Sequence, residues 1–214
     1  MKTAKFLFCC LTLFFFAMTS AQASFVDLED VVPGLLENSS RTSQGYTLAH
    51  TGSFAYAFGN GEQGATEFSG NGTIRVISFN TSTLTLSEST GAKFDIFSFE
   101  GGESWIQQPH GWATQIQAVG SLFGGGTTTQ VFDLDLIKDP LVGMQLFSFN
   151  GTFRGLTSVS FSGMGGNPEF SVDNFSVAVV AEPNSLALLG LALAGLGLMR
   201  RKKAIARYGI KVPR

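Results

Sequence analysis

Cysteine and histidine are scarce in this chain of 214 residues. Its two cysteines, Cys9 and Cys10, lie in an apolar stretch close to the N-terminus. No cysteine follows them, so the rest of the chain has no disulfide and no thiol chemistry. The two histidines, His50 and His110, have no second histidine or cysteine at ligand spacing, which argues against a zinc site. We therefore expect no metal and no cofactor.

Positive charge is also scarce in the middle of the chain. Residues 24–181 contain five Lys and Arg against 15 Asp and Glu, a net charge of −10. Nucleic acid requires a cationic surface that displaces counterions, so this acidity argues against a nucleic-acid partner. It is compatible with metal ions or neutral glycans without demonstrating either, and it would keep an exported protein soluble.

Recognisable catalytic motifs are absent as well. There is no Gly-x-Ser-x-Gly elbow and no phosphate-binding loop. Two acid pairs, Glu100 with Glu103 and Asp133 with Asp135, have the residue type that a glycoside hydrolase needs. Asp133 and Asp135 fall on the polar face of an alternating segment, which a solvated surface explains. Because none of these acids has an orienting partner, we assign no catalytic residue.

The N-terminus has the three parts of a secretory signal peptide. Lys2 and Lys5 form its charged start, and an apolar region follows from Phe6 to Met18. Ala21 and Ala23 form a small-x-small cleavage site. Residues 1–23 are therefore expected to direct export through the Sec translocon and to be removed.

The C-terminus has three parts of its own. A polar break at Ala181, Glu182 and Pro183 precedes an uncharged Leu/Ala/Gly segment, and four cations follow it. The apolar segment predicts a short transmembrane helix over residues 185–199. The positive-inside rule places the basic cluster (residues 200–203) and the basic tail (204–214) in the cytoplasm. The cations of the cluster are Arg200, Arg201, Lys202 and Lys203.

These three parts, in this order, resemble the PEP-CTERM sorting signal of Gram-negative bacteria. The resemblance covers residues 181–203, about a tenth of the chain. It implies a membrane-embedded exosortase as partner, cleavage near the Pro-Glu-Pro position, and an association with exopolysaccharide and biofilm. Two features depart from the family: Ala181 replaces the first proline, and the chain continues past the basic cluster to Arg214.

Residues 24–180 are predicted to form one all-β domain, a β-sandwich or jelly roll. Apolar and polar residues alternate over short segments separated by Gly-rich turns. The predicted strands include Tyr46–Phe58, Thr73–Ser78, a central strand from Phe94, Gln115–Gly120, Phe132–Leu136 and Glu169–Val180.

The last predicted strand changes its apolar parity. Phe170 and Val172 share one face, whereas Phe175 has the opposite parity. One extra residue near Asp173 and Asn174 would keep all three on the core side, so we predict a β-bulge there.

The second half of this domain, from Phe94 to Val180, resembles the galactose-binding-like jelly rolls of exported bacterial proteins. It has an aromatic loop (Gly101–Trp112), a strand, a Gly-Gly-Gly turn and a closing Val-Asp-Asn-Phe strand. The resemblance implies a fold rather than an activity.

Both tryptophans of the chain fall in that aromatic loop. Trp105, His110 and Trp112 could bind glycans through ring stacking and hydrogen bonds to hydroxyls. The alternative is that the tryptophans close the end of the sandwich, since large aromatics are mostly buried.

Two functions remain after these exclusions. The first is a non-enzymatic protein that is exported, anchored by its tail, processed by an exosortase and deployed at the cell surface or in extracellular polysaccharide. The second is a secreted carbohydrate-active enzyme on the same scaffold. An acid pair converging with the tryptophans in a cleft would favour the second, and the sequence favours the first.

Overall fold

The computed structural model describes residues 23–36, 40–59, 70–104, 112–137, 143–165 and 168–180, together with Gly195. The chain divides after Val180 into two units. In the second unit only Gly195 is described, and it is helical. Within these ranges, no helix has the length and apolarity that a membrane crossing requires. Three predicted segments lie outside the described residues: the remainder of the transmembrane segment, the basic cluster, and residues 1–22 of the signal peptide.

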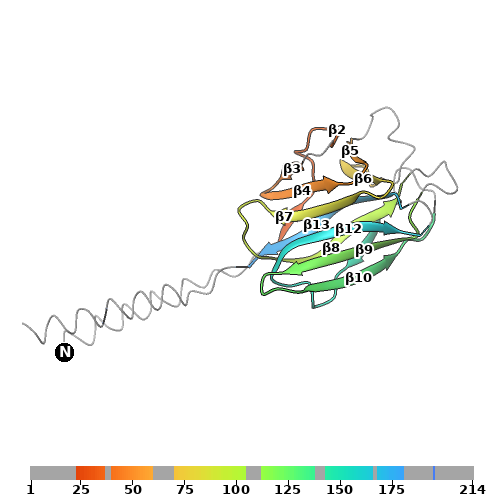
Figure 1. The fold of residues 1–214 in the computed structure, drawn as a ribbon. Coiled ribbons are helices and arrows are strands. Elements are labelled where there is room, and N and C mark those ends of the chain that lie inside the picture. The colour runs from red at the N-terminus through yellow and green to blue at the C-terminus, as the bar shows by residue number, and fades with distance from the viewer. Residues whose placement is uncertain are drawn as a thin grey trace, which may run out of the picture. The chain divides into compact units, whose positions relative to one another are not determined.

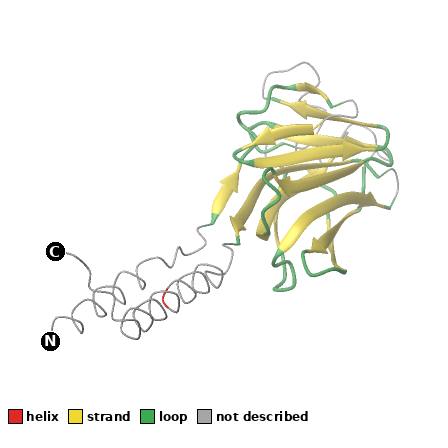
Figure 2. Ribbon diagram, turned by 60° about the vertical axis from the view of Figure 1, so that its left-hand side comes forward, coloured by secondary structure: helices red, strands yellow, loops and turns green. Residues whose placement is uncertain are grey.

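The described part of the first unit consists of strands and loops (Figure 1, Figure 2). It has 13 strands: β1 (Ser24–Val26), β2 (Gly34–Leu35), β3 (Ser40–Ser43), β4 (Tyr46–Thr51), β5 (Phe54–Phe58), β6 (Arg75–Phe79), β7 (Thr83–Glu88), β8 (Phe94–Glu103), β9 (Gln115–Leu122), β10 (Thr127–Asp133), β11 (Gln145–Ser148), β12 (Leu156–Met164) and β13 (Phe170–Val179). The prediction of an all-β fold is confirmed.

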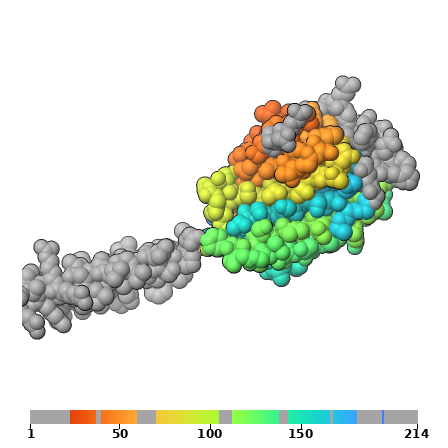
Figure 3. Space-filling model, in the orientation of Figure 1, coloured from red at the N-terminus to blue at the C-terminus, as the bar shows by residue number. Residues whose placement is uncertain are grey.

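The strands form two antiparallel layers. One has the order β2-β5-β6-β13-β8-β11, and the other β3-β4-β7-β12-β9-β10. A single pair, Leu156 with Phe94, joins β12 to β8 and links the layers, while β1 pairs with β13. The second layer faces the viewer in Figure 3, where the orange, yellow, blue and green bands of β4, β7, β12 and β9 lie side by side. Segments far apart in sequence are thus neighbours, as in a β-sandwich.

Phenylalanine side chains from both layers fill the core. The ring of Phe99 on β8 lies 5.0 Å from Phe161 on β12 and 5.1 Å from Phe132 on β10, between ring centroids. Phe175 on β13 packs 5.6 Å from Phe161. All four are buried, and edge-on and tilted contacts of this kind add to the stability from burial.

The predicted bulge in the last strand is confirmed. The register between β13 and β8 shifts between Asp173 and Ser176, and Asn174 has a φ of 52°. Asparagine tolerates this left-handed conformation better than most residues. Phe170, Val172 and Phe175 all reach the core despite their different parity.

Two predicted strands and one predicted loop have different boundaries in the structure. The segment Tyr46–Phe58 is broken at Gly52, whose φ of 109° turns the chain from β4 in one layer to β5 in the other. The start of the predicted loop from Gly101 instead extends β8 to Glu103, because β13 pairs with it there. The alternation beyond Phe132 ends with β10 at Asp133, and Leu136 is 46% exposed at a φ of 61°.

Candidate functional site

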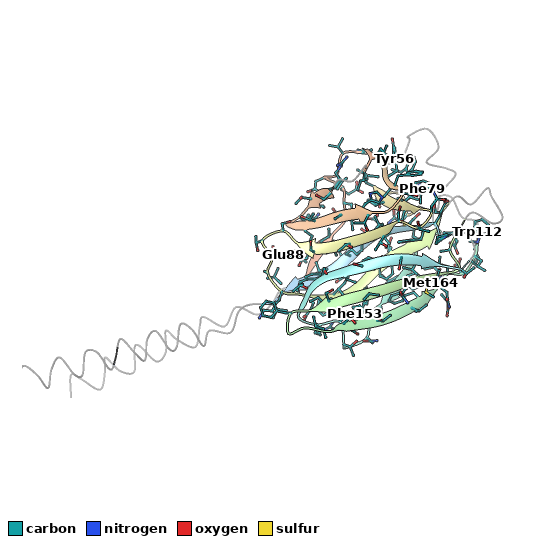
Figure 4. The ribbon with its side chains drawn as sticks, in the orientation of Figure 1. Tyr56, Phe79, Glu88, Trp112, Phe153 and Met164 are labelled. Atoms are coloured by element: carbon teal, nitrogen blue, oxygen red, sulfur yellow. The ribbon has the colours of Figure 1, made fainter. Side chains whose placement is uncertain are left out.

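One half of the outer face of the β2–β11 layer is aromatic. On β5, Phe54, Tyr56 and Phe58 alternate with two alanines that enter the main core. Phe54 stacks on Phe79 of β6 with ring centroids 4.5 Å apart, and Tyr56 lies 4.2 Å from Phe58. Tyr56 and Phe79 are labelled together in Figure 4. Phe58 and Phe79 are buried, but Phe54 is 37% exposed and Tyr56 is half-buried, so this half offers ring surface at its edge.

The other half of the same face is polar. Asp173 on β13 and Glu100 on β8 are direct partners across the ladder, so their side chains share this face. Asn71 lies over both: its Nδ2 donates to Glu100 Oε2 at 2.6 Å and to Asp173 Oδ2 at 2.8 Å. An amide nitrogen has two protons, which matches one donation to each carboxylate.

Two further residues complete this polar cluster. Thr73 Oγ1 lies 2.7 Å from Asp173 Oδ2 and 2.5 Å from Asn71 Oδ1. The backbone N–H of Asn174 donates to Asp173 Oδ1 at 2.7 Å, and its side-chain amide donates to Glu100 at 3.0 Å. The bulge therefore turns Asn174 back toward the same carboxylates.

Burial raises the pKa of Asp173 to about 7, although hydrogen bonds from Asn71, Thr73 and the Asn174 backbone lower it; nearby Glu100 adds to the rise. The geometry is consistent with a neutral acid. The Thr73 hydroxyl has one proton but lies between two oxygens. If Asp173 is protonated, it donates to Thr73, which can then donate to Asn71.

The acid pair Glu100 and Glu103 does not converge. Because these residues are three apart on a regular strand, they lie on opposite faces of β8. Glu103 is buried on the core side, where its Oε1 accepts the backbone N–H of Leu136 at 2.6 Å. Burial raises the pKa of Glu103. Two other pairs of carboxylates do meet: Asp173 with Glu100 across the ladder, and Glu103 with Asp135, whose proximity raises the pKa of Glu103 further. The sequence predicted neither pair, since only the fold brings their members together.

The second acid pair lies at an exposed edge. Asp133 accepts from the side chain of Gln115 at 2.6 Å, and Asp135 accepts from the backbone N–H of Ile137 at 2.9 Å. Both carboxylates are engaged in local contacts at the surface, as the alternation predicted. Among the described residues, no group of three or more His, Cys, Asp or Glu could hold a metal ion.

Of the three predicted glycan-binding residues, only Trp112 is placed. It is half-buried just before β9, at the end of the sandwich opposite Glu88 (Figure 4). The N–H of its neighbour Ala113 donates to the carbonyl of Glu169 at 2.7 Å, which fixes this segment beside the start of β13. Trp105 and His110 lie outside the described residues, as do Ala181, Glu182, Pro183 and Ala21 of the two predicted processing sites. Ala23 is described and is exposed before β1.

The C-terminal segment is similar to a known protein family. Residues 179–202 match the PEP-CTERM protein-sorting motif. This sorting motif directs an exported protein to an exosortase, and the predicted resemblance over residues 181–203 is confirmed. No curated protein matches the chain.

Several solved structures are similar to the chain. A family 29 carbohydrate-binding module has 11% identity and a TM-score of 0.43, covering 77% of this chain and 98% of its own. The family 32 module of C. perfringens NanJ in complex with galactose has 9% identity and a TM-score of 0.36, covering 68% and 99%. The family 11 module of Lic26A-Cel5E from Clostridium thermocellum has 10% identity and a TM-score of 0.34, covering 76% and 97%. At these scores, the fold assignment rests on the strand pairing of this chain itself.

Proposed function

We propose that this chain is an exported, non-enzymatic surface protein that binds extracellular polysaccharide weakly. It crosses the inner membrane through the Sec translocon, is held there by its C-terminal segment, and is then processed by an exosortase. The processed protein is deployed at the cell surface or in a biofilm matrix. The observation that supports this proposal is the match of residues 179–202 to the sorting motif.

Glycan binding is assigned to the exposed edge of the aromatic half-face. The rings of Phe54 and Tyr56 expose apolar surface, and the Tyr56 hydroxyl adds a polar tip. Aromatic rings stack on the C–H faces of pyranose sugars. A hydroxyl group beside the rings, such as that of Tyr56, can form hydrogen bonds with the hydroxyl groups of the sugar. Two partly exposed rings fit weak binding to a repeating polymer rather than tight binding to one sugar.

The enzymatic alternative requires carboxylic acids that reach a substrate. A general acid must approach the reacting oxygen within hydrogen-bond distance. Asp173 is 0% exposed, and both of its oxygens are engaged by Asn71, Thr73 and Asn174. The cluster is therefore better suited to fixing residues 71–73 against the sheet than to catalysis.

The sorting proposal is tested by the C-terminal mass of the mature protein from the producing bacterium, with and without its exosortase. We expect a C-terminus between Ala181 and Asn184 in the wild-type host, and an uncut chain when the enzyme is absent. A C-terminus at Arg214 in the membrane fraction of both strains would contradict processing.

Glycan binding is tested by affinity electrophoresis of the secreted protein in gels that contain the host exopolysaccharide. Tyr56→Ala should lose retardation, whereas Val131→Ala, an exposed site in the other layer, should retain it. A parallel variant, Trp105→Ala, distinguishes the sheet edge from the aromatic loop. Unchanged mobility of the wild type in every polysaccharide gel would reject binding by either surface.

A further inference from the structure

The strand order brings the end of β13 together with several turns. Ser24 of β1 pairs with Val177, and the N–H of Val180 donates to the carbonyl of Lys93 at 2.8 Å. The N–H of Phe123, in the β9–β10 turn, donates to the carbonyl of Gly155 at 3.0 Å. We call this end of the sandwich the exit end; Figure 1 shows β13 ending there and β10 beginning there. It comprises Ser24–Phe25, Ala92–Lys93, Phe123–Gly126, Gly155 and Val179–Val180.

The exit end has large apolar side chains in solvent. Phe123 is 60% exposed, Phe25 is 52% exposed and Val179 is 41% exposed. The ammonium of Lys93 lies 4.4 Å above the centroid of the Phe123 ring. An aromatic ring with a long-chain amine beside it suits the membrane–water interface, where the ring enters the headgroup layer and the amine stays in water.

Charge at the exit end is close to balanced. Arg154, next to Gly155, forms an ion pair with Asp95 at 3.6 Å. The carboxylate of Glu88, the last residue of β7, accepts the backbone N–H groups of Thr90 and Ala92 in the following turn at 2.8 and 2.9 Å. Apolar contact rather than attraction between opposite charges would therefore govern binding to a bilayer here.

The covalent chain limits how far this end can lie from a membrane. The sorting motif begins at Val179, within β13 itself, and the apolar segment begins at Leu186. A fully extended chain spans about 3.5 Å per residue, so Leu186 lies within roughly 20 Å of Val180. No long linker separates the folded domain from the anchoring segment.

We propose that the exit end docks on the surface of the lipid bilayer in which residues 186–199 are anchored, with Phe123 in the headgroup region. This inference rests on the anchoring step of the proposed function. Docking holds the sandwich upright on the membrane before processing, with its aromatic half-face free for polysaccharide.

The test uses single-cysteine labelling of the chain from Ser24 to Arg214, which remains after the predicted removal of the signal peptide. This chain has no cysteine of its own, so Phe123→Cys provides the single thiol for an environment-sensitive fluorophore. Phe54→Cys is the matched control, because Phe54 is also exposed but lies away from the exit end. Its backbone N–H donates to Ser82, just before the start of β7, whereas the exit end lies beyond the other end of β7 at Glu88. Each labelled chain is reconstituted into phosphatidylcholine vesicles with and without headgroup-quencher lipid. Flotation is measured first, and emission second.

We expect both labelled chains to float with the vesicles. The emission of the label at position 123 should shift to the blue and be quenched by the headgroup-quencher lipid, whereas the emission of the label at position 54 should neither shift nor be quenched. Chains that fail to float would overturn anchoring and docking together. Floating chains with no shift at position 123 would overturn docking alone. A shift that appears only when an exosortase is co-reconstituted would overturn lipid docking and identify the enzyme as the occupant. Val179→Cys provides a second labelled site should Phe123→Cys fold poorly.

Discussion

Asp173 and Glu100 face each other across the β13–β8 ladder and share one amide nitrogen, Asn71 Nδ2, at 2.8 and 2.6 Å. Two carboxylates so close cannot both be ionised at low cost in a buried site. Below about pH 7, a proton on Asp173 would relieve this repulsion and leave the hydrogen bonds that fix residues 71–73 on the sheet.

Stability should fall as the pH rises from about 4 to about 7. The pKa of Asp173 is about 7 in the folded chain and 3.8 for the ordinary group, so between these values the folded state binds more protons than the unfolded state. Burial of Glu103 acts in the same direction. Each pH unit in this window costs about 1.4 kcal/mol per group, so Asp173 accounts for at most about 4 kcal/mol.

Urea unfolding at pH 5 and pH 8 measures this effect. Asp173→Asn should have a smaller difference in unfolding free energy between the two pH values, because it cannot ionise. The exposed Asp133→Asn should retain the wild-type difference. An equal pH dependence in wild type and Asp173→Asn would contradict the assignment.

Asn71→Asp should destabilise the fold by about 3 kcal/mol at pH 8, since it removes two donated hydrogen bonds and adds a third carboxylate. The loss should be smaller at pH 5, where Asp173 is protonated. Asn80→Asp is the control, because Asn80 is exposed in a turn at a φ of 53°, which aspartate also adopts. Equal effects of the two substitutions in urea unfolding would reject the bridging role of Asn71.

Gly163→Ala should lower the unfolding free energy by about 2 kcal/mol, the usual cost of overpacking. A Cβ at Gly163 on β12 would overlap the backbone carbonyl of Pro168, which cannot rotate away as a side chain could. Gly151→Ala, where a Cβ meets nothing within 4 Å, should stay within about 0.5 kcal/mol of wild type. Thermal unfolding of both variants measures the difference in stability. Equal melting temperatures would contradict the prediction and show that the segment at Pro168 moves to admit the methyl group.

Ala181→Pro should increase the processed fraction in the native host, because it restores the proline with which the motif of the family begins. Glu182→Ala should decrease that fraction. The ratio of cut to uncut chain is measured by C-terminal mass, with the exposed Asp133→Asn in the folded domain as the control. If neither substitution changes the processed fraction, the exosortase recognises other residues within 179–202.

The sequence predicted those features that depend on neighbouring residues. Ile116 and Ala118 occupy alternate positions of the predicted strand Gln115–Gly120, and both are buried on β9 as the two-residue period of a strand requires. The parity change around Asp173 predicted the bulge for the same reason. The sorting motif was equally accessible, because its three parts are contiguous and are distinguished by composition alone.

Errors arose where a strand ends or changes layer. Gly52 divides the predicted Tyr46–Phe58 strand, although apolar residues continue on both sides of it. Alternation does not reveal a change of layer, because both layers bury one face against the same core.

The sequence by itself determined the all-β class, the bulge and the sorting motif, since strand parity and composition are local properties of the chain. Only the tertiary structure decided which polar groups meet. Asn71 and Thr73 reach Asp173 across about 100 residues of sequence, and Glu100 joins them while Glu103 faces the core. Antiparallel register sets these partners, and it depends on how all the strands pair rather than on any one segment. The same pairing places Phe123 and Lys93 beside the end of β13, which no periodicity in the sequence indicates.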